Sequence, residues 1–125
     1  MKKENNIKNL IKTLFEQDQF DRKQFKLGKL SLTVLKINDR KRRKEMEDSL
    51  SVFGQQLDGE SFFYSAIPFL HSEDLKDLNM SLTLAQESLN LGYERAEALI
   101  KAAEDKILIA KGKPQKHGTQ TKVKN

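Results

Sequence analysis

The sequence predicts a mainly α-helical fold, with a helical N-terminal region and a C-terminal set of helices that ends in a small β-hairpin. Three observations predict it. Apolar residues recur at helical spacing through most of the chain. Asp58-Gly59 is a turn signal between two apolar stretches. Near the C-terminus, a short β-prone run precedes a loop rich in glycine and lysine. We therefore expect two regions, residues 1–58 and residues 59–125.

The first two expected helices lie in the basic N-terminal region. Residues 4–16 place apolar side chains on one helical face and lysines on the other. Residues 20–37 fit a second helix, although LSLTVLKI within them also alternates like a strand and contains β-branched residues. A helix is preferred there because Gly28 and the lysines suit an exposed back face.

The third and fourth expected helices flank the turn. Residues 39–57 carry an apolar stripe at helical spacing, and Asn38 or Asp39 is expected to cap this helix. After the turn, residues 60–70 form the most apolar stretch of the chain and should line the core. Because a proline in a helix interior costs about 3 kcal/mol, we expect a kink or a new turn at Pro68.

Two more helices are expected before the β-prone run. Ser72 is expected to cap a short turn, and Ser81 to cap the helix after it. The tripeptide Asn-Leu-Gly at 90–92 should break that helix. Residues 93–106 should form the next one, with these side chains facing the core: Ala96, Leu99, Ile100 and Ala103.

The C-terminal stretch leaves two interpretations open. ILIA at residues 107–110 is short and β-prone. The basic residues 111–125 either form a disordered tail or supply a second strand, TQTKVK, to a hairpin. Two helices with a three-residue break, followed by such a hairpin, are the order of a winged helix–turn–helix.

Specific residues sharpen this interpretation. Residues 81–104 contain a serine at a helix start, a glutamine in mid-helix, and a Gly-Tyr turn before Arg-Ala, in a recognisable order without a gap. The residues concerned are Ser81, Gln86, Leu91, Gly92, Tyr93, Arg95, Ala96, Ile100 and Glu104. Residues 81–109 thereby resemble the C-terminal gamma domain of FtsK-type DNA translocases. Upstream residues look like that domain's first helix: Tyr64, Ala66, Ile67, Phe69 and Leu70. The resemblance covers roughly residues 60–125, and it implies a small winged helix that reads a short directional motif in duplex DNA.

Three positions depart from that family's pattern. Its reading surface tends to be basic or amide-bearing where this chain has Asn90, Glu94 and Ala98. Glu94 replaces an asparagine, and Ala98 replaces an arginine. A carboxylate is repelled by phosphate, although it can accept a hydrogen bond from cytosine N4 in the major groove. The resemblance therefore implies the fold more firmly than the DNA sequence that is read.

Charge is distributed in three blocks along the chain. Residues 1–59 carry 14 Lys/Arg and 9 Asp/Glu, residues 60–110 carry 4 and 9, and residues 111–125 carry 5 and none, for a net charge of +5. A basic excess favours a polyanionic partner. Because the middle block is acidic, contact with nucleic acid should rely on the two basic flanks.

Composition excludes several classes of site. The chain has no cysteine, which excludes disulfides, zinc fingers and thiol catalysis. Its two histidines, His71 and His117, are 46 positions apart and fit no metal-ligand spacing. No glycine-rich phosphate loop is present, which excludes an ATP motor. No other groups converge on the carboxylates that could form a catalytic pair, Glu94, Glu97, Glu104 and Asp105, so we expect no enzyme, metal or cofactor. No apolar run approaches a membrane span of roughly 18 residues, and no secretory signal is apparent; we expect a cytoplasmic protein without a membrane partner.

The sequence thus predicts a non-enzymatic, duplex-DNA-binding winged-helix protein. The five consecutive basic residues at 40–44 should contact phosphates, because cations at a helix start oppose the helix dipole and need another reason to be there. The full set of expected DNA contacts is Arg40, Lys41, Arg42, Arg43, Lys44, Gln86, Asn90, Tyr93, Glu94, Arg95, Lys101, Lys111, Lys113, Lys116, His117, Lys122 and Lys124.

The process we expect is DNA transfer, partition or transcription, in an accessory or regulatory role. Residues 22–30 look faintly like the basic, Leu-Gly-containing stretch of small mobilisation proteins of conjugative elements. Besides double-stranded DNA, the candidate partners are a relaxase, transfer or partition protein and a second copy of the chain. The alternative is a protein-interaction module, in which an acidic winged helix docks on a basic partner and the N-terminal helices dimerise.

Overall fold

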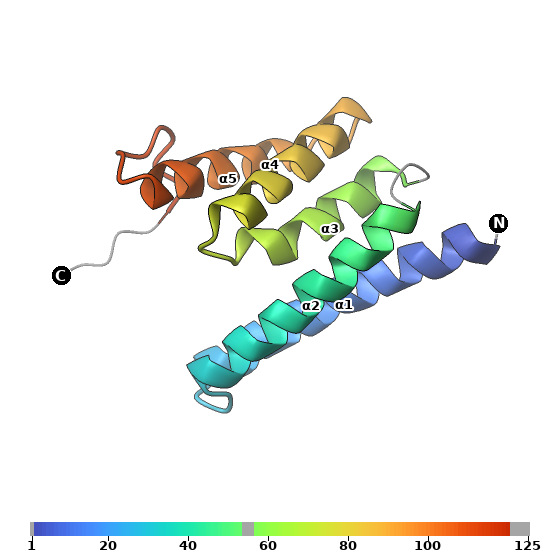
Figure 1. Cartoon of the computed structure of the whole chain (residues 1–125), viewed down its shortest axis with the longest axis horizontal. Coiled ribbons are helices and arrows are strands. Elements are labelled where there is room, and N and C mark those ends of the chain that lie inside the picture. The colour runs from blue at the N-terminus through green and yellow to red at the C-terminus, as the bar shows by residue number, and fades with distance from the viewer. Residues whose placement is uncertain (1, 54–56, 121–125) are drawn as a thin grey trace.

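The computed structural model describes residues 2–53 and 57–120. Within these residues it shows five helices and no β-strand (Figure 1). In chain order the helices are α1 (Lys2–Lys26), α2 (Leu32–Phe53), α3 (Gly59–Leu70), α4 (Leu75–Asn90) and α5 (Ala96–Ala110). α1 and α2 form an antiparallel hairpin, and α3 contacts both this hairpin and α4. The prediction of a mainly helical fold is confirmed.

The N-terminal region holds two long helices where the sequence predicts three. The expected break before residue 20 is absent, because α1 continues through it to Lys26. The chain turns instead at Gly28, whose φ of 75° is a left-handed conformation that glycine adopts without strain. The amides of Gly28 and Lys29 donate to the carbonyls of Phe25 and Gln24 at 3.0 and 2.8 Å, which forms a Schellman cap. Gly28 therefore ends a helix and does not lie on a helical back face.

The start of α2 also differs from the prediction. Ser31, not Asn38 or Asp39, caps this helix, and its Oγ accepts the Val34 N–H at 3.1 Å. Asn38 and Asp39 lie inside α2, where their side chains bond to side chains of α1. The strand alternative for this segment is wrong, since α2 begins within it.

α3 follows the prediction closely. Asp58 caps it by accepting the Ser61 amide at 2.9 Å, so the turn predicted here is confirmed. Pro68 lies in the last turn of α3, and the helix continues past it to Leu70. The proline therefore does not begin a new helix.

α4 begins earlier than predicted, and the two serines expected as caps have other roles. Asp74 caps the helix through a bond from a first-turn amide. Ser72 Oγ accepts the Asp74 amide at 3.0 Å and donates to Asp77 at 2.7 Å. Ser81 is buried inside α4 and donates to the Ala66 carbonyl of α3 at 2.9 Å. Ser81 thus ties α4 to α3 rather than starting a helix.

The predicted break between α4 and α5 is confirmed, since residues 91–95 are not helical. α5 begins at Ala96, three residues later than expected. Figure 1 shows α5 running back along α4, which it contacts. The two helices therefore form an antiparallel pair packed beside α3.

The predicted β-wing is wrong for the part of the chain that the structure describes. Residues 107–110, expected as its first strand, belong to α5. Ile107 is buried and continues the stripe of Leu99 and Ala103 at a spacing of four residues. Burial of this helical stripe outweighs the local β-propensity of ILIA. The proposed second strand, residues 119–124, lies largely outside the described residues.

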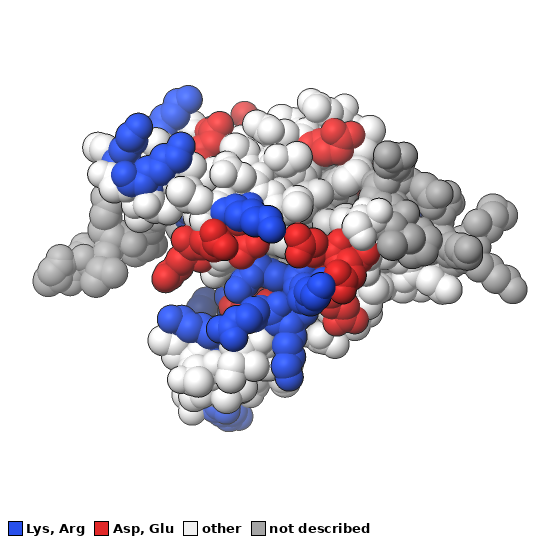
Figure 2. All heavy atoms as spheres, in the orientation of Figure 1, with Lys and Arg blue, Asp and Glu red and all other residues white. Residues whose placement is uncertain are grey.

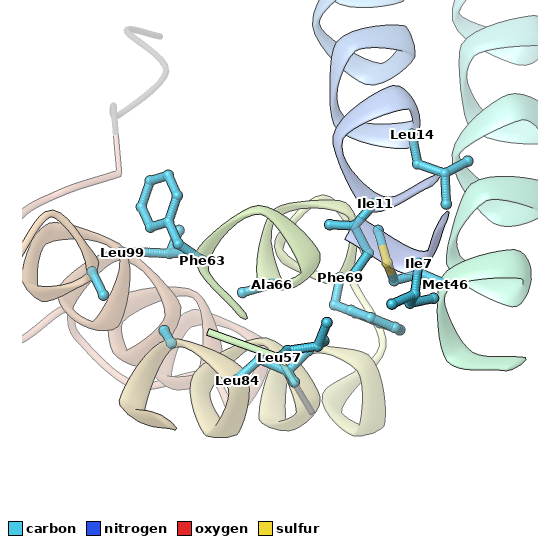
Figure 3. Packing of buried hydrophobic residues seen from close by; sticks show 12 residues of the cluster. Ile7, Ile11, Leu14, Met46, Leu57, Phe63, Ala66, Phe69, Leu84 and Leu99 are labelled. Atoms are coloured by element: carbon cyan, nitrogen blue, oxygen red, sulfur yellow. The ribbon is translucent and has the colours of Figure 1, made fainter. Parts of the chain in front are cut away.

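A continuous hydrophobic core joins the five helices (Figure 3). Its buried members come from both sides of the expected boundary: Ile7, Ile11, Leu14, Met46, Leu57, Phe63, Ala66, Phe69, Leu84, Ala85, Ala96 and Leu99. Figure 3 shows Phe69 of α3 beside Ile11 and Met46 of the hairpin. The division into residues 1–58 and 59–125 stays a prediction. In the described residues, no helix combines the length and the apolar character needed to span a membrane.

Candidate nucleic-acid interface

The five consecutive basic residues predicted to contact phosphate lie on different sides of α2. Arg40, Lys41 and Lys44 are exposed, whereas Arg42 is buried and Arg43 is half-buried. The division follows from helical geometry, because successive residues point about 100° apart around the axis. One side of α2 packs on α1 and α3, so a run of five must send some members inward.

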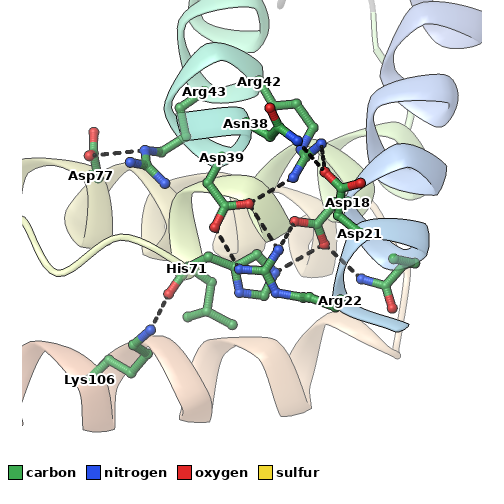
Figure 4. A network of polar contacts seen from close by, with 12 residues as sticks. Asp18, Asp21, Arg22, Asn38, Asp39, Arg42, Arg43, His71, Asp77 and Lys106 are labelled. Atoms are coloured by element: carbon green, nitrogen blue, oxygen red, sulfur yellow. Dashed lines mark hydrogen bonds and ion pairs between the residues drawn. The ribbon is translucent and has the colours of Figure 1, made fainter. Parts of the chain in front are cut away.

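Arg42 and Arg22 form a charged network inside the α1–α2 hairpin (Figure 4). Arg42 donates to Asp21 at 2.7 Å and to Asp39 at 2.8 Å. Arg22 donates to both oxygens of Asp39, at 2.9 and 2.8 Å, and to Asp18 at 2.6 Å. Asp18, Asp21 and Arg22 belong to α1 and the other two to α2, so the network binds one helix to the other.

The network keeps Asp39 and Arg42 charged. Burial alone would raise the pKa of Asp39, but hydrogen bonds from Arg22 and Arg42 outweigh burial and hold the pKa below its usual value. Burial alone would lower the pKa of Arg42, but its bonds to Asp21 and Asp39 raise the pKa above its usual value. Arg42 can therefore reach a phosphate only by breaking two internal ion pairs.

Arg43 and His71 line a hollow between α2 and the turn that joins α3 to α4. Nε of Arg43 lies 3.4 Å from Oδ2 of Asp77. Nη1 of Arg43 is buried and has no hydrogen-bond partner among the described residues. Nε2 of His71 lies 3.1 Å from Oδ2 of Asp18. The hollow has a volume of about 140 Å³ and is lined by Lys36, Asp39, Arg40, Arg43, His71, Ser72 and Glu73.

Sequence reasoning missed Lys36 and His71 at this place. Lys36 lies one helical turn before Arg40 and two turns before Lys44. This spacing of four residues is a sequence signal that places Lys36 on the same side of the helix. His71 offers no such signal, because its partner Asp18 is 53 positions away in the sequence. Only the packing of α3 against α1 brings the two together.

The α4–turn–α5 segment carries the second group of predicted contacts. Tyr93 is half-buried, and the others are exposed: Gln86, Asn90, Glu94, Arg95 and Lys101. The Arg95 guanidinium lies 5.0 Å from the centroid of the Phe63 ring and donates to the Tyr93 hydroxyl at 3.3 Å. Arg95 is thus exposed but already makes two contacts within the protein.

The exposed face of α5 and its preceding turn is not basic. Glu94 and Glu97 offset Arg95 and Lys101, so these four exposed side chains carry no net charge. The residues predicted to face the core are buried or half-buried: Ala96, Leu99, Ile100 and Ala103. The predicted orientation of α5 is therefore right, but its outer face has no excess of positive charge for phosphates.

Asp105 holds the segment after α5 against that helix. Its buried carboxylate accepts the amides of Lys116, His117 and Thr119, each at 2.8 Å, and the Thr119 hydroxyl at 2.7 Å. Burial would raise the pKa of Asp105, but these hydrogen bonds outweigh it and hold the pKa well below its usual range. Nε2 of His117 also lies 2.7 Å from Glu104. The described part of the expected wing is therefore an anchored loop.

This loop presents part of the third group of predicted contacts. Lys111, Lys113 and Lys116 are exposed on it, and His117 is half-buried. Lys122 and Lys124 lie outside the described residues. Figure 2 shows basic side chains gathered over α2 and over the loop after α5, with acidic side chains between them. A ligand that bridged both basic areas would meet these acids, so the α2 area is the stronger candidate by itself.

Comparison of the chain with protein-family models, curated proteins and solved structures found no match. The resemblance of residues 81–109 to the gamma domain of FtsK-type translocases therefore stays a hypothesis that rests on the residues quoted above. What the site can do must be argued from its own charges and geometry.

Proposed function

We propose that this protein binds duplex DNA through the exposed basic side of α2 and is not an enzyme. The observation that carries the proposal is that Lys36, Arg40 and Lys44 are all exposed. We call these three residues the α2 stripe. They lie at i, i+4 and i+8, so they follow one side of the helix at intervals of about 6 Å. Lys41 is exposed next to them. A row of cations at this spacing suits a row of phosphates.

The ion pairs beneath the stripe support this role. Arg22 of α1 bonds to Asp39 of α2, and Arg42 of α2 bonds to Asp21 of α1. The stripe therefore lies on a helix that is held firmly to its neighbour. Cations that are already positioned lose less conformational freedom when they meet a partner. Lys44 also pairs with Asp48 at 3.2 Å, but an exposed pair of this kind contributes little and can be exchanged for a phosphate.

Binding of this kind carries little sequence information, because phosphates are the same at every base pair. Its affinity should fall steeply with salt as neutralised phosphates release counterions. In the proposal, the exposed loop lysines add to this electrostatic contact, and Arg95 is the candidate contact to a base. The resemblance of residues 81–109 supports a reading role for α5. An accessory or regulatory role in DNA transfer, partition or transcription fits such a protein.

The test is the salt dependence of binding to a mixed-sequence duplex. The variant Lys36→Gln/Arg40→Gln/Lys44→Gln removes the stripe at exposed positions, so the fold should be kept. The slope of log affinity against log salt should become shallower by about 0.9 for each lost phosphate contact. The loss should be the same for unrelated duplex sequences.

A matched control removes the same charge elsewhere. Lys12, Lys29 and Lys76 are also exposed, and Lys12→Gln/Lys29→Gln/Lys76→Gln should change the slope much less. Equal slopes for the two triple variants would show that net charge, not the stripe, sets the affinity. Absence of duplex binding by the unaltered chain at about 50 mM salt, where phosphate contacts are strong, would end the proposal.

A second candidate is a protein-interaction module, and one observation favours it. The free end of the α1–α2 hairpin exposes several large apolar side chains: Phe20, Phe25, Leu27, Leu32, Val34 and Ile37. In this alternative a second copy covers the hairpin end, while Glu94 and Glu97 face a basic partner. A dimer in sedimentation that Phe25→Ser dissociates, together with no duplex binding at about 50 mM salt, would favour it.

A further inference from the structure

The hollow between α2 and the α3–α4 turn is lined by side chains from two separate parts of the chain. Lys36, Arg40 and Arg43 line it from α2, at i, i+4 and i+7, and His71 lines it from the end of α3. Figure 4 shows Arg43 and His71 reaching this region from different elements. Its volume of about 140 Å³ is well below the roughly 300–1,000 Å³ of pockets for larger ligands. The space suits a small polyatomic ion.

Arg43 has an unused donor at this place. Its side chain is only 17% exposed, and the ion pair from its Nε to Asp77 is long at 3.4 Å. Nη1 is buried without a hydrogen-bond partner among the described residues. A buried N–H without a partner is costly, and rotation of this loosely held side chain can direct the donor into the hollow. An acceptor-rich ligand would satisfy it.

Most of the acids around the hollow are already engaged. Both oxygens of Asp39 accept from Arg22, and one of them also accepts from Arg42. Asp77, next to the lining, accepts the Ser72 hydroxyl at 2.7 Å. Glu73 is exposed, so water can solvate its charge.

His71 faces the Asp18 carboxylate, which also accepts from Arg22 and Gln19. Asp18 is fully buried and does not line the hollow. With Asp39 and Asp77 engaged, the lining presents Lys36, Arg40 and Arg43 against the exposed carboxylate of Glu73, which leaves an excess of positive charge.

We propose that this hollow binds one phosphoryl group. Phosphoryl oxygens are strong acceptors that pair with guanidinium and ammonium groups, and Lys36, Arg40 and Arg43 supply both kinds. The inference rests on the proposed function in one respect, because Lys36 and Arg40 also belong to the α2 stripe. A duplex that lies on the stripe would therefore bring a backbone phosphodiester to the hollow. A terminal phosphate or free inorganic phosphate offers the same chemistry.

The first experiment titrates the full chain with inorganic phosphate at fixed ionic strength and follows the amide chemical shifts. Saturable shifts should gather at residues 36–43 and 71–77. Arg43→Lys, which keeps the charge but loses the planar donors, should weaken binding about tenfold. Lys36→Gln changes an exposed side chain and should weaken binding severalfold without affecting folding. Lys12→Gln, also exposed, should leave the affinity unchanged.

The same titration can overturn the inference. The inference fails if no saturable shift occurs at phosphate concentrations up to roughly 10 mM, which is ten times a weak dissociation constant of about 1 mM. It also fails if Arg43→Lys and Lys36→Gln bind phosphate as tightly as Lys12→Gln does, or if the shifts lie elsewhere.

A second experiment identifies the source of the phosphoryl group by comparing one duplex with 5′-hydroxyl ends and the same duplex with 5′-phosphate ends. A preference for the phosphorylated duplex that Arg43→Lys removes supports a terminal phosphate. If the two duplexes bind with the same affinity, and Arg43→Lys lowers both affinities by the same factor, the bound group is a backbone phosphodiester. If phosphate binds the hollow but no duplex binds, the proposed function fails while the hollow stands. If the duplex binds and phosphate does not, the proposal for the hollow is wrong, while the proposal for the α2 stripe is retained.

Discussion

The α1–α2 hairpin and the α3–α5 unit are held together by different forces. Ile7, Ile11 and Leu14 bury apolar side chains near one end of the hairpin. Beyond them, ion pairs of Arg22 and Arg42 join the two helices beside the buried Leu35. The α3–α5 unit buries large apolar side chains such as Phe69 and Leu78 together with small residues. Serine hydroxyls of α4 also bond to carbonyls of α3 there.

This difference predicts which substitutions each region tolerates. A buried ion-pair network fails when one partner is removed, because the other is left as an uncompensated charge. Helices in close contact through small residues fail when a side chain grows, because the interior is close-packed. The hairpin should therefore be most sensitive to loss of charge, and the α3–α5 unit to gain of volume.

The largest effect should come from Arg42→Ala in the hairpin. It removes the guanidinium that bonds to Asp21 and Asp39 at 2.7 and 2.8 Å. Asp39 keeps its bonds from Arg22, but Asp21 loses its ion pair, and loss of one member of a buried pair costs about 3–5 kcal/mol. Urea unfolding measures the loss. Its neighbour Arg40 is exposed, so Arg40→Ala should stay within about 0.5 kcal/mol of the unaltered chain. Similar midpoints for the two variants would contradict the role given to the network.

The next effect should come from Ala85→Leu in the α3–α5 unit. Ala85 is fully buried in the core cluster, and extra methylene groups in a packed core cost about 1–3 kcal/mol. The adjacent Gln86 is exposed, so Gln86→Leu should change the free energy of unfolding by less than about 0.5 kcal/mol. If Gln86→Leu destabilises as strongly, packing against α3 is not the cause.

A smaller effect should appear as a pH dependence of the hairpin. The folded-state pKa of Asp39 is lowered because bonds from Arg22 and Arg42 outweigh burial. Its stabilisation is therefore complete above the usual carboxyl pKa of about 3.9 and is lost as the pH falls through the lower folded value. Urea midpoints between about pH 5 and pH 2 should fall more for the unaltered chain than for Asp39→Asn. Parallel curves would show that Asp39 does not contribute in this way.

The smallest effect on global stability should come from Asp105→Asn. Its carboxylate accepts three amides and a hydroxyl of the segment after α5, and this segment adds no member to the shared core. The amides of Lys116, His117 and Thr119 should exchange faster with solvent, while the unfolding midpoint moves less than in either substitution above. Unchanged exchange at these amides would mean that the loop is held by other contacts.

Local signals predicted several parts of the fold. The turn at Asp58-Gly59, the helix over residues 60–70 and the break at 90–92 were all found, since each depends on residues a few positions apart. The turn at Gly28 was missed, although glycine followed by a serine cap is itself a local signal. The apolar spacing of residues 20–37 favours one continuous helix and so conflicts with this signal.

The candidate site was less predictable than the fold. The sequence shows plainly that residues 40–44 are basic. It does not show that Arg42 points inward to Asp21 and Asp39 while Arg40 is exposed. The hollow combines Lys36 and Arg43 with His71 from another helix. No spacing within one segment connects them, because their proximity arises from the packing of α2 against α3.

The sequence by itself determined that the fold is mainly helical and how charge is divided among the blocks of the chain. Tertiary structure decided which charges are internal and that residues 107–110 are helical rather than a strand. The reason is one of magnitude. Helix and strand propensities differ by about 1 kcal/mol or less per ordinary residue, whereas burying an aliphatic side chain contributes about 1.5–3 kcal/mol and leaving a buried charge unpaired costs about 3–5 kcal/mol. Where local preference and burial disagree, as at Ile107 and Asp39, burial determines the structure.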